Sequence, residues 1–342
     1  MTALSQLPEP LLSWYDAHRR DLPWRREVSP YRTWVSEIML QQTRVTAVIP
    51  YFERFMAVYP TVEALAAAPE EELMRLWQGL GYYSRARNLQ KAAREIAARG
   101  GFPDTYEEVR ALPGIGDYTA GAILSIAMGQ PIPAVDGNVL RVAARITGSD
   151  ANILDEKTKK DCRAQMEAVI PRHRPGAFNQ ALMDLGATVC LPGAPLCGEC
   201  PARTFCTAHG QGREKELPVR LKKKEKRREE LTVFVLQKDG RAALRRREDR
   251  GLLAGLWEFP HVPGHLDEAQ AAAQAARWGL QVTAWQRSHT AVHEFTHIRW
   301  EMVGYVLTVT GEGPEDWRWC DAEERDRRAI PSAFEKFVKE LA

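Results

Sequence analysis

The sequence predicts two domains of different class, an all-helical domain followed by an α+β domain. From residue 8 to about residue 208, apolar residues recur at three- and four-residue spacing without sustained alternation, as in packed helices. Beyond residue 230, segments rich in β-branched and aromatic residues interleave with helical patterns. The chain has 342 residues, enough for two or three domains of about 100 to 200 residues each.

Helix boundary signals recur within the first of these regions. Thr105 and Glu108 form a capping-box pattern, and Gly148 is typical of a helix stop. Apolar positions such as Trp34 and Ile38 are candidates for the core. The pattern therefore predicts a helical domain over residues 1–209.

A basic segment separates the two regions. Residues 211–230 contain nine basic and five acidic side chains, which indicates a solvated linker at 210–230 that can also meet phosphates. The second domain is then predicted at 231–342, with strands at 231–236, 281–285 and 302–309 and helices at 267–278 and 331–341.

The composition excludes several classes of protein. A hydrophobic content of 44% and a charged content of 27% are typical of globular proteins and argue against disorder. The net charge of +2 excludes a uniformly basic surface, so any nucleic-acid-binding surface must be local. The longest small and apolar run, at 121–129, is well short of the roughly 20 residues of a bilayer span, and no leader is evident. We therefore expect a cytoplasmic protein.

Four of the six cysteines are clustered. Cys190, Cys197, Cys200 and Cys206 lie within 17 residues, with six, two and five residues between successive cysteines. Four soft thiolates on one loop suit an iron-sulfur cluster or a tetrahedral zinc ion, and the spacing alone does not choose between them. Buried free thiols are the third interpretation.

A glycine-containing turn lies between two helical patterns at 112–126. Gly114 and Gly116 leave backbone amides bare at the start of the second helix, and such amides bind phosphate without reading base sequence. The segment predicts a helix-hairpin-helix that grips a DNA backbone, and the alternative is an ordinary glycine turn.

Together with Asp136, these motifs resemble the endonuclease III superfamily of base-excision DNA glycosylases. Residues 34–43, 79–89 and 135–139 are similar, almost letter for letter, to the MutY-type adenine DNA glycosylases. The resemblance implies removal of adenine mispaired with 8-oxoguanine or guanine in duplex DNA. It also implies a [4Fe-4S] cluster on the four cysteines.

The chemistry of the residues is consistent with this implication. Cleavage of an N-glycosidic bond requires protonation of the leaving base and stabilisation of an oxocarbenium-like sugar, and so two carboxyl groups in different environments. Glu37 lies in an apolar helical segment that should raise its pKa, so that it can hold a proton for adenine N7. Asp136 precedes a glycine and a helical pattern and can stay ionised to support the cation or attack the sugar.

The resemblance also assigns roles to other residues. Tyr118 stands where lyase-competent relatives carry a lysine, and a phenol cannot form a Schiff base, so a monofunctional glycosylase is expected. Tyr118 and Asn138 are implied to orient or stabilise the carboxylates. Gln42 and Tyr82 resemble the residues that insert into and stack within the duplex when a base is extruded.

The remaining implied residues contact one of two bases. Those near 8-oxoguanine are Thr43 and Leu80, together with the loop Phe295, Thr296 and His297. Those lining the pocket for the flipped adenine are Arg20, Trp24, Arg25, Leu40 and Gln180.

Two motifs in the second domain favour other activities. Residues 251–260 resemble the opening of a Nudix hydrolase motif, but alanines at 272 and 273 stand where metal-binding carboxylates should be, so a Nudix-like recognition domain is expected. His293, Glu294 and His297 match a zinc-protease pattern that requires a helix, whereas this region predicts a strand.

Two further hypotheses remain open. One is a relative directed at thymine or oxidised pyrimidines, which Tyr118 and the second domain disfavour. The other is a noncatalytic iron-sulfur DNA-binding protein, which the pair Glu37 and Asp136 disfavours. We expect a monomer that associates with the nucleoid through double-stranded DNA and not with membranes.

Overall fold

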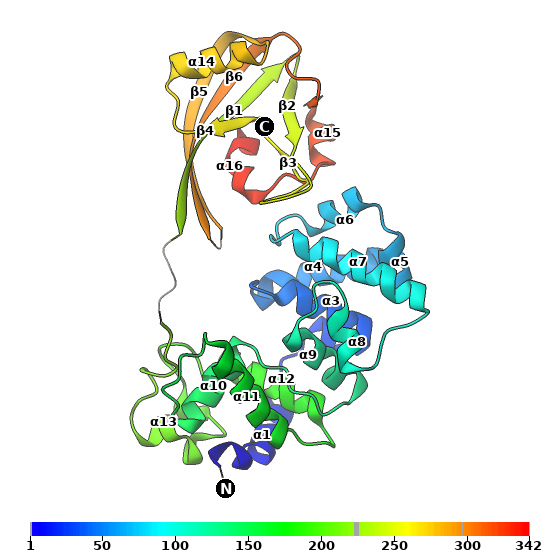
Figure 1. Cartoon of the computed structure of the whole chain (residues 1–342), viewed down its shortest axis with the longest axis vertical. Coiled ribbons are helices and arrows are strands. Elements are labelled where there is room, and N and C mark those ends of the chain that lie inside the picture. Colours follow the sequence, from blue (N-terminus) through cyan, green and yellow to red (C-terminus); the bar gives the residue numbers. More distant parts are fainter. Residues whose placement is uncertain (1, 222–225, 296, 342) are drawn as a thin grey trace. The chain divides into compact units, whose positions relative to one another are not determined.

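The computed structural model describes residues 2–221, 226–295 and 297–341, and its contacts divide the chain into two compact units (Figure 1). The first unit contains the chain up to Ala68 and again from Arg87 to the basic segment. The second contains Pro69–Ala86 together with the C-terminal part. Helical periodicity runs through Pro69–Ala86, so the sequence does not predict this grouping.

Helices account for the chain up to Gly210, which confirms the predicted all-helical class of this part. The helices are α1 (Pro8–His18), α2 (Pro23–Arg26), α3 (Pro30–Leu40), α4 (Val45–Val58), α5 (Val62–Ala67), α6 (Glu70–Trp77), α7 (Ser84–Arg99), α8 (Tyr106–Ala111), α9 (Asp117–Met128), α10 (Gly137–Thr147), α11 (Glu156–Val169), α12 (Pro175–Thr188) and α13 (Thr207–Gly210). Short 3-10 turns are η1 (Ala3–Gln6), η2 (Cys197–Glu199) and η3 (Arg203–Phe205).

Helix α3 is buried on nearly all sides. It begins at Pro30, whose fixed φ suits a first helical turn, and the Ser29 side chain accepts a hydrogen bond from the Arg32 amide. Trp34 and Ile38 are buried as predicted, and α3 packs against α9. Because the helix is enclosed, the polar side chains along it are removed from water as well.

The predicted helix-hairpin-helix is formed by α8, a tight turn and α9. Gly114 has a φ of +78°, in the left-handed region that favours glycine, and a Cβ there would lie 2.8 Å from the Asn88 Cβ. Gly116 is the N-cap of α9 and has no side chain that could accept a hydrogen bond from the first amides of the helix, which suits an external acceptor. The Asp117 carboxylate at the start of α9 is held by Arg110 and by the Tyr106 hydroxyl, at 2.9 Å.

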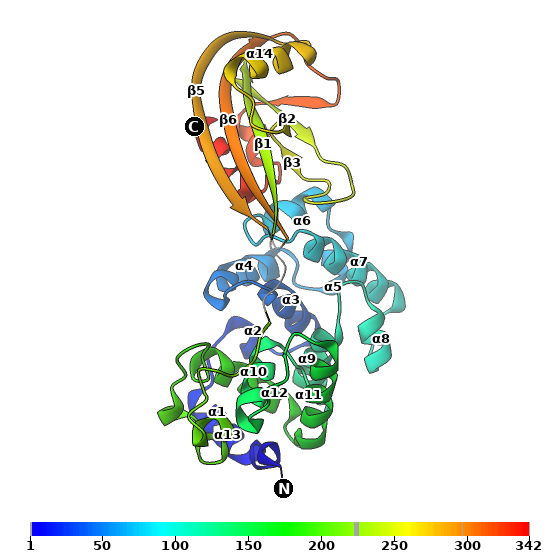
Figure 2. The same ribbon diagram turned by 60° about the vertical axis from the view of Figure 1, so that its left-hand side comes forward.

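A mixed sheet forms the centre of the second unit (Figure 2). Its strands are β1 (Arg227–Lys238), β2 (Arg241–Arg246), β3 (Trp257–Glu258), β4 (His261–Pro263), β5 (Gln281–Glu294), β6 (Ile298–Thr310) and β7 (Trp317–Cys320). The order is β3-β2-β1-β6-β5, with β4 paired to β1 and β7 to β2. Strands β1 and β6 are parallel, and the other pairs are antiparallel.

Helices cover both faces of this sheet. Phe234 and Leu236 on β1 pack with Ala271 of α14 (Glu268–Arg277). Val233 and Val235 point to the other face and pack with residues of η4 (Ser332–Phe334) and α16 (Glu335–Val338). This two-residue alternation buries both faces of the strand, and it confirms the α+β class.

The structure departs from the sequence interpretation in three places. Strand β1 starts at Arg227, inside the segment read as linker, and Leu217 of that segment is buried. Strands β2, β3, β4 and β7 and helix α15 (Ala322–Asp326) were not predicted, because short segments give little periodic signal. The helix predicted at 331–341 is broken into η4, α16 and η5 (Lys339–Leu341).

Across the described residues, every helix is too short or too polar to cross a lipid bilayer.

Candidate active site and cysteine loop

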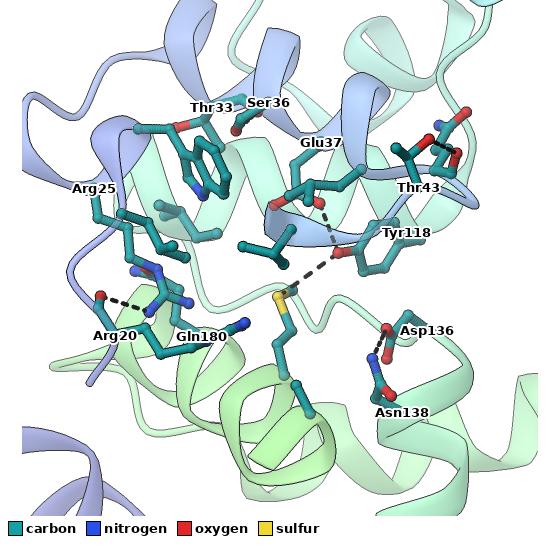
Figure 3. Close-up of a pocket in the computed structure, with 18 of the residues that line it drawn as sticks. Arg20, Arg25, Thr33, Ser36, Glu37, Thr43, Tyr118, Asp136, Asn138 and Gln180 are labelled. Atoms are coloured by element: carbon teal, nitrogen blue, oxygen red, sulfur yellow. Dashed lines mark hydrogen bonds between the residues drawn. The ribbon is translucent and has the colours of Figure 1, made fainter. Parts of the chain in front are cut away.

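A cavity of about 440 Å³ opens between α3, α9 and α12 of the first unit (Figure 3). It brings together eleven of the residues singled out from the sequence: Arg20, Trp24, Arg25, Glu37, Leu40, Gln42, Thr43, Tyr118, Asp136, Asn138 and Gln180. They come from segments as far apart in the chain as α2 and α12, so the fold brings together side chains that are distant in the sequence.

Glu37 lies on the wall of this cavity and is only 6% exposed. Burial raises the pKa of its carboxyl from the ordinary 4.5 to about 7, as the apolar sequence around it predicts. The Tyr118 hydroxyl donates a hydrogen bond of 2.6 Å to Glu37 Oε2 and opposes this rise, whereas the charge of Asp136 adds to it. Glu37 can therefore keep a proton near neutral pH, which an exposed glutamate cannot do.

Asp136 lies at the N-terminus of α10 and serves as its N-cap. Its carboxylate accepts hydrogen bonds of 2.8 Å from the Val139 amide and from Asn138 Nδ2. Burial raises the pKa of Asp136, and these hydrogen bonds oppose the rise because they favour the charged form. The two carboxyl groups of the cavity are thus held in different environments.

Asp184 is a site residue that the sequence analysis missed. It is fully buried on α12 and binds Arg20 Nε at 2.7 Å and Arg25 Nη1 at 2.7 Å. It thereby fixes both arginines of the cavity wall. A signal was present in the sequence, since Asp184 interrupts the apolar run 181–186, and an acidic residue within a buried helix face requires a partner.

Other predicted residues do not line this cavity. Leu80 and Tyr82 belong to Pro69–Ala86, the segment grouped with the second unit. Phe295 and His297 flank the turn between β5 and β6, and Thr296 lies outside the described residues.

Gln42 and Tyr82 share an uncommon backbone conformation. Their φ angles are +58° and +48°, in the left-handed region that side-chain-bearing residues rarely adopt. Tyr82 is also 44% exposed although it is a large aromatic residue. Strained, exposed residues of this kind are typical of binding surfaces.

The four clustered cysteines line a second, largely apolar cavity, together with Val142, Ile146, Leu185, Val189 and Pro195. Cys190 is buried, and Cys197, Cys200 and Cys206 are half-buried. Arg145 Nη1 lies 3.2 Å from Cys190 Sγ and can stabilise negative charge on that sulfur. A metal ion or cluster bound by all four thiolates is therefore consistent with the four sulfur ligands and with the apolar cavity around them.

A second donor group is adjacent. One ligand atom each from Cys197, His209 and Glu214 lies within 4.8 Å of the others. His209 Nδ1 and Glu214 Oε1 are already joined at 2.5 Å, however, so both would have to exchange this bond for a metal.

Helix α10 connects the two cavities. Arg141 donates hydrogen bonds to Asn138 Oδ1 at 2.9 Å, to the Gly186 carbonyl at 2.7 Å and to the Cys190 carbonyl at 2.8 Å. The Arg141 guanidinium therefore binds both the cysteine loop and Asn138, which is the hydrogen-bond partner of Asp136.

The zinc-protease pattern has no suitable geometry. His293 and Glu294 end strand β5, and His297 precedes β6. The motif therefore lies off any helix, as the sequence predicts.

Two family models match separate parts of the chain. A family model described as HhH-GPD superfamily base excision DNA repair protein matches residues 35–170, and a NUDIX domain model matches residues 232–340. The chain is therefore a DNA N-glycosylase of the helix-hairpin-helix class with a Nudix-like C-terminal domain.

The relatives define the family further. The adenine DNA glycosylase of Rattus norvegicus is 38% identical over 96% of this chain and 76% of its own length. That of Homo sapiens is 36% identical over 96% of this chain and 72% of its own length. The chain belongs to the adenine DNA glycosylase family.

Solved structures match the helical part. A thermostable thymine-DNA glycosylase is 27% identical with a TM-score of 0.56, covering 61% of this chain and 97% of that one. A trapped endonuclease III–DNA covalent intermediate is 25% identical with a TM-score of 0.52, covering 62% of this chain and 99% of that one.

Replacing Asp184 by Asn should destabilise the protein by about 3 kcal/mol, because two arginines lose a buried anion. Asp16→Asn is the matched control, since Asp16 also binds an arginine, Arg174, but at the surface, where an ion pair contributes little to stability. Denaturant unfolding measures the loss of stability in each of the two variants. Equal losses in the two variants would contradict the anchoring role of Asp184.

Glu37→Gln should change how stability depends on pH. In the folded protein Glu37 holds its proton up to about pH 7, against about 4.5 for an ordinary glutamate, so the folded state binds more protons between these values. The free energy of unfolding of the wild type therefore falls as pH rises through this window. Gln cannot ionise, so the variant should gain up to about 3 kcal/mol relative to wild type between about pH 4.5 and 8.

The pH titration of unfolding should include Glu167→Gln, an exposed substitution on α11. This variant controls for the loss of a carboxyl group that remains exposed to water. A stability difference between Glu37→Gln and wild type that does not change with pH would show that Glu37 has an ordinary pKa.

Proposed function

We propose that this chain excises adenine mispaired with 8-oxoguanine or guanine in duplex DNA, by base flipping and acid-assisted cleavage of the N-glycosidic bond. The observation that carries the proposal is the cavity that holds Glu37 and Asp136 in different environments. Its volume of about 440 Å³ falls within the range of small-ligand pockets and suits an extruded base.

Glu37 is the general acid in this proposal. With a pKa of about 7, it carries a proton at neutral pH and can transfer it to adenine N7 as the bond to the sugar breaks. The departing base then leaves neutral. The hydrogen bond from Tyr118 keeps the carboxyl group oriented and favours its charged form once the proton has gone.

Asp136 acts on the sugar. Its two hydrogen bonds favour a carboxylate, which stabilises the developing oxocarbenium ion or attacks the anomeric carbon. Asn138 positions this carboxylate and is itself held by Arg141. Position 118 offers a phenol and no amine, so the enzyme stops at the abasic site and is monofunctional.

The flipped base is recognised by the cavity wall. Arg20 and Arg25, fixed by Asp184, and Gln180 present polar groups, while Trp24 and Leu40 supply apolar surface. Hydrogen bonds at the edge of the base and apolar contacts with its faces are the usual means of reading an extruded base.

The duplex is held by other parts of the chain. The bare amides behind Gly114 and Gly116 bind a backbone phosphate. Gln42 and Tyr82, whose strained backbone and exposure suit insertion, fill and buttress the gap left by the flipped base.

The opposite base is read by a further set of residues. The residues proposed to contact 8-oxoguanine are Thr43 and Leu80, together with Phe295, Thr296 and His297. The Nudix-like domain recognises the lesion and does not hydrolyse nucleotides, since α14 carries alanines at 272 and 273 in place of metal-binding carboxylates.

We infer that Cys190, Cys197, Cys200 and Cys206 hold a [4Fe-4S] cluster. Four thiols lining one apolar cavity support this set over the mixed group of Cys197, His209 and Glu214. The cluster would brace the loop through four iron–thiolate bonds, and no step of base excision requires it.

Metal analysis of the purified chain tests this inference. We expect about four irons and four sulfides per chain, and no stoichiometric zinc. Cys200→Ser should lose iron and soluble yield, whereas Cys320→Ser, a buried cysteine of the other unit, should retain full iron. One zinc per chain would contradict the cluster.

The activity is tested with a duplex that bears adenine opposite 8-oxoguanine, under single-turnover conditions. We expect strand breaks at the adenine only after hot alkali, because the enzyme leaves an intact abasic site. Glu37→Gln and Asp136→Asn should each lower the rate constant by roughly 100-fold or more.

Three outcomes would contradict the proposal in different ways. Breaks without alkali would indicate a lyase. A bound but uncleaved duplex would indicate a noncatalytic DNA-binding protein. A loss of activity in the exposed control Glu167→Gln equal to that in Glu37→Gln would remove the case for a specific acid.

A further inference from the structure

Thr33 carries a buried hydroxyl group that lacks a hydrogen-bond partner. The residue lies on α3, is 3% exposed and lines the same cavity as Glu37 (Figure 3). Among the described residues, none forms a hydrogen bond with Thr33 Oγ1. An unpaired buried hydroxyl costs free energy, so its presence requires an explanation.

The helix itself does not satisfy this group. A helical threonine commonly donates its hydroxyl to a carbonyl three or four residues earlier. Here the Ser29 carbonyl accepts the Thr33 amide at 2.9 Å and has no bond to the hydroxyl. The neighbouring Ser36, which also lines the cavity, does donate to the Thr33 carbonyl at 2.8 Å, so the absence is particular to Thr33.

The position of Thr33 relative to Glu37 indicates which group of a bound base could form a hydrogen bond with the Thr33 hydroxyl. Residues four apart on a helix lie on the same face, one turn from each other. Glu37 is proposed to address adenine N7, and on adenine the N6 amine lies beside N7 on the same edge. In a complex with the base held in this way, a group one turn from Glu37 can meet the substituent at position 6.

We propose that Thr33 is a specificity-determining residue whose hydroxyl accepts a hydrogen bond from the N6 amine of the flipped adenine. The hydroxyl reaches the cavity by rotation about χ1, since threonine has two accessible rotamers in a helix. The inference rests on the proposed adenine glycosylase activity. It adds a recognition contact that none of the motifs in the sequence indicates.

The test combines a protein substitution with a change in the substrate. Thr33→Val removes the hydroxyl and keeps the branched shape. Single-turnover excision is measured on two duplexes, one with adenine and one with unsubstituted purine opposite 8-oxoguanine. Thr33→Val should slow adenine removal roughly 3- to 10-fold and purine removal less than about twofold.

Two further variants separate recognition from structure. Thr33→Ser retains the hydroxyl and should keep the preference of the wild type for adenine. Thr147→Val removes a hydroxyl that is bonded within α10 to the Ala143 carbonyl, and should affect both substrates equally or not at all. The thermal midpoint of Thr33→Val should not fall, because the lost hydroxyl makes no hydrogen bond with the part of the chain that the structure describes.

Equal slowing of both substrates by Thr33→Val, or no slowing of either, would overturn the proposal. A wild-type protein that removes neither base would instead refute the proposed function, and the role of Thr33 with it. The two failures are therefore distinguishable.

Discussion

The removal of the Glu37 carboxyl group from water is the constraint on which the candidate site depends. Helix α3 is enclosed by other helices, so a glutamate on it exchanges water for Tyr118 and the cavity wall. Burial of this kind destabilises the charged form and brings its pKa to about 7. An acid that would be ionised at the surface becomes able to donate a proton at neutral pH. The same burial that makes Glu37 a proton donor at neutral pH also lowers the stability of the folded protein.

Helix α10 organises the second half of the site. Asp136 caps its N-terminus, Asn138 orients that carboxylate, and Arg141 ties Asn138 to the loop of Cys190. Arg145, one turn further along the helix, contacts the sulfur of the same cysteine. The loop that is proposed to hold a cluster thus lies against the helix that positions Asp136. A cluster that stabilises the cysteine loop would therefore also help to hold the Asp136 carboxylate in position.

Much of this could be read from the sequence because the relevant signals are local. The apolar spacing around Trp34 and Ile38, the glycines of the hairpin and the cysteine spacing each depend on a few neighbouring residues. The raised pKa of Glu37 also followed from its apolar segment. The resemblance then connected these signals into one site, and the cavity contains eleven of the residues that it implied.

What the sequence analysis missed depends on long-range contacts or on short elements. Asp184 binds Arg20 across 164 positions of the chain, and periodicity does not reveal such pairs. That the Thr33 hydroxyl lacks a hydrogen bond among the described residues depends on the positions of all neighbouring groups, which the sequence does not give. The grouping of Pro69–Ala86 with the C-terminal part and the short strands β3 and β4 likewise follow from tertiary contacts.

The central claim, that Glu37 is a desolvated acid whose pKa the Tyr118 hydrogen bond holds down, is tested most directly by the pH dependence of single-turnover adenine excision. The rate constant of the wild type should fall above about pH 7 as Glu37 loses its proton. In Tyr118→Phe the hydrogen bond that favours the carboxylate is lost, so this fall should move to higher pH. A rate that stays flat from about pH 6 to 9, or a fall that moves to lower pH in Tyr118→Phe, would contradict the account.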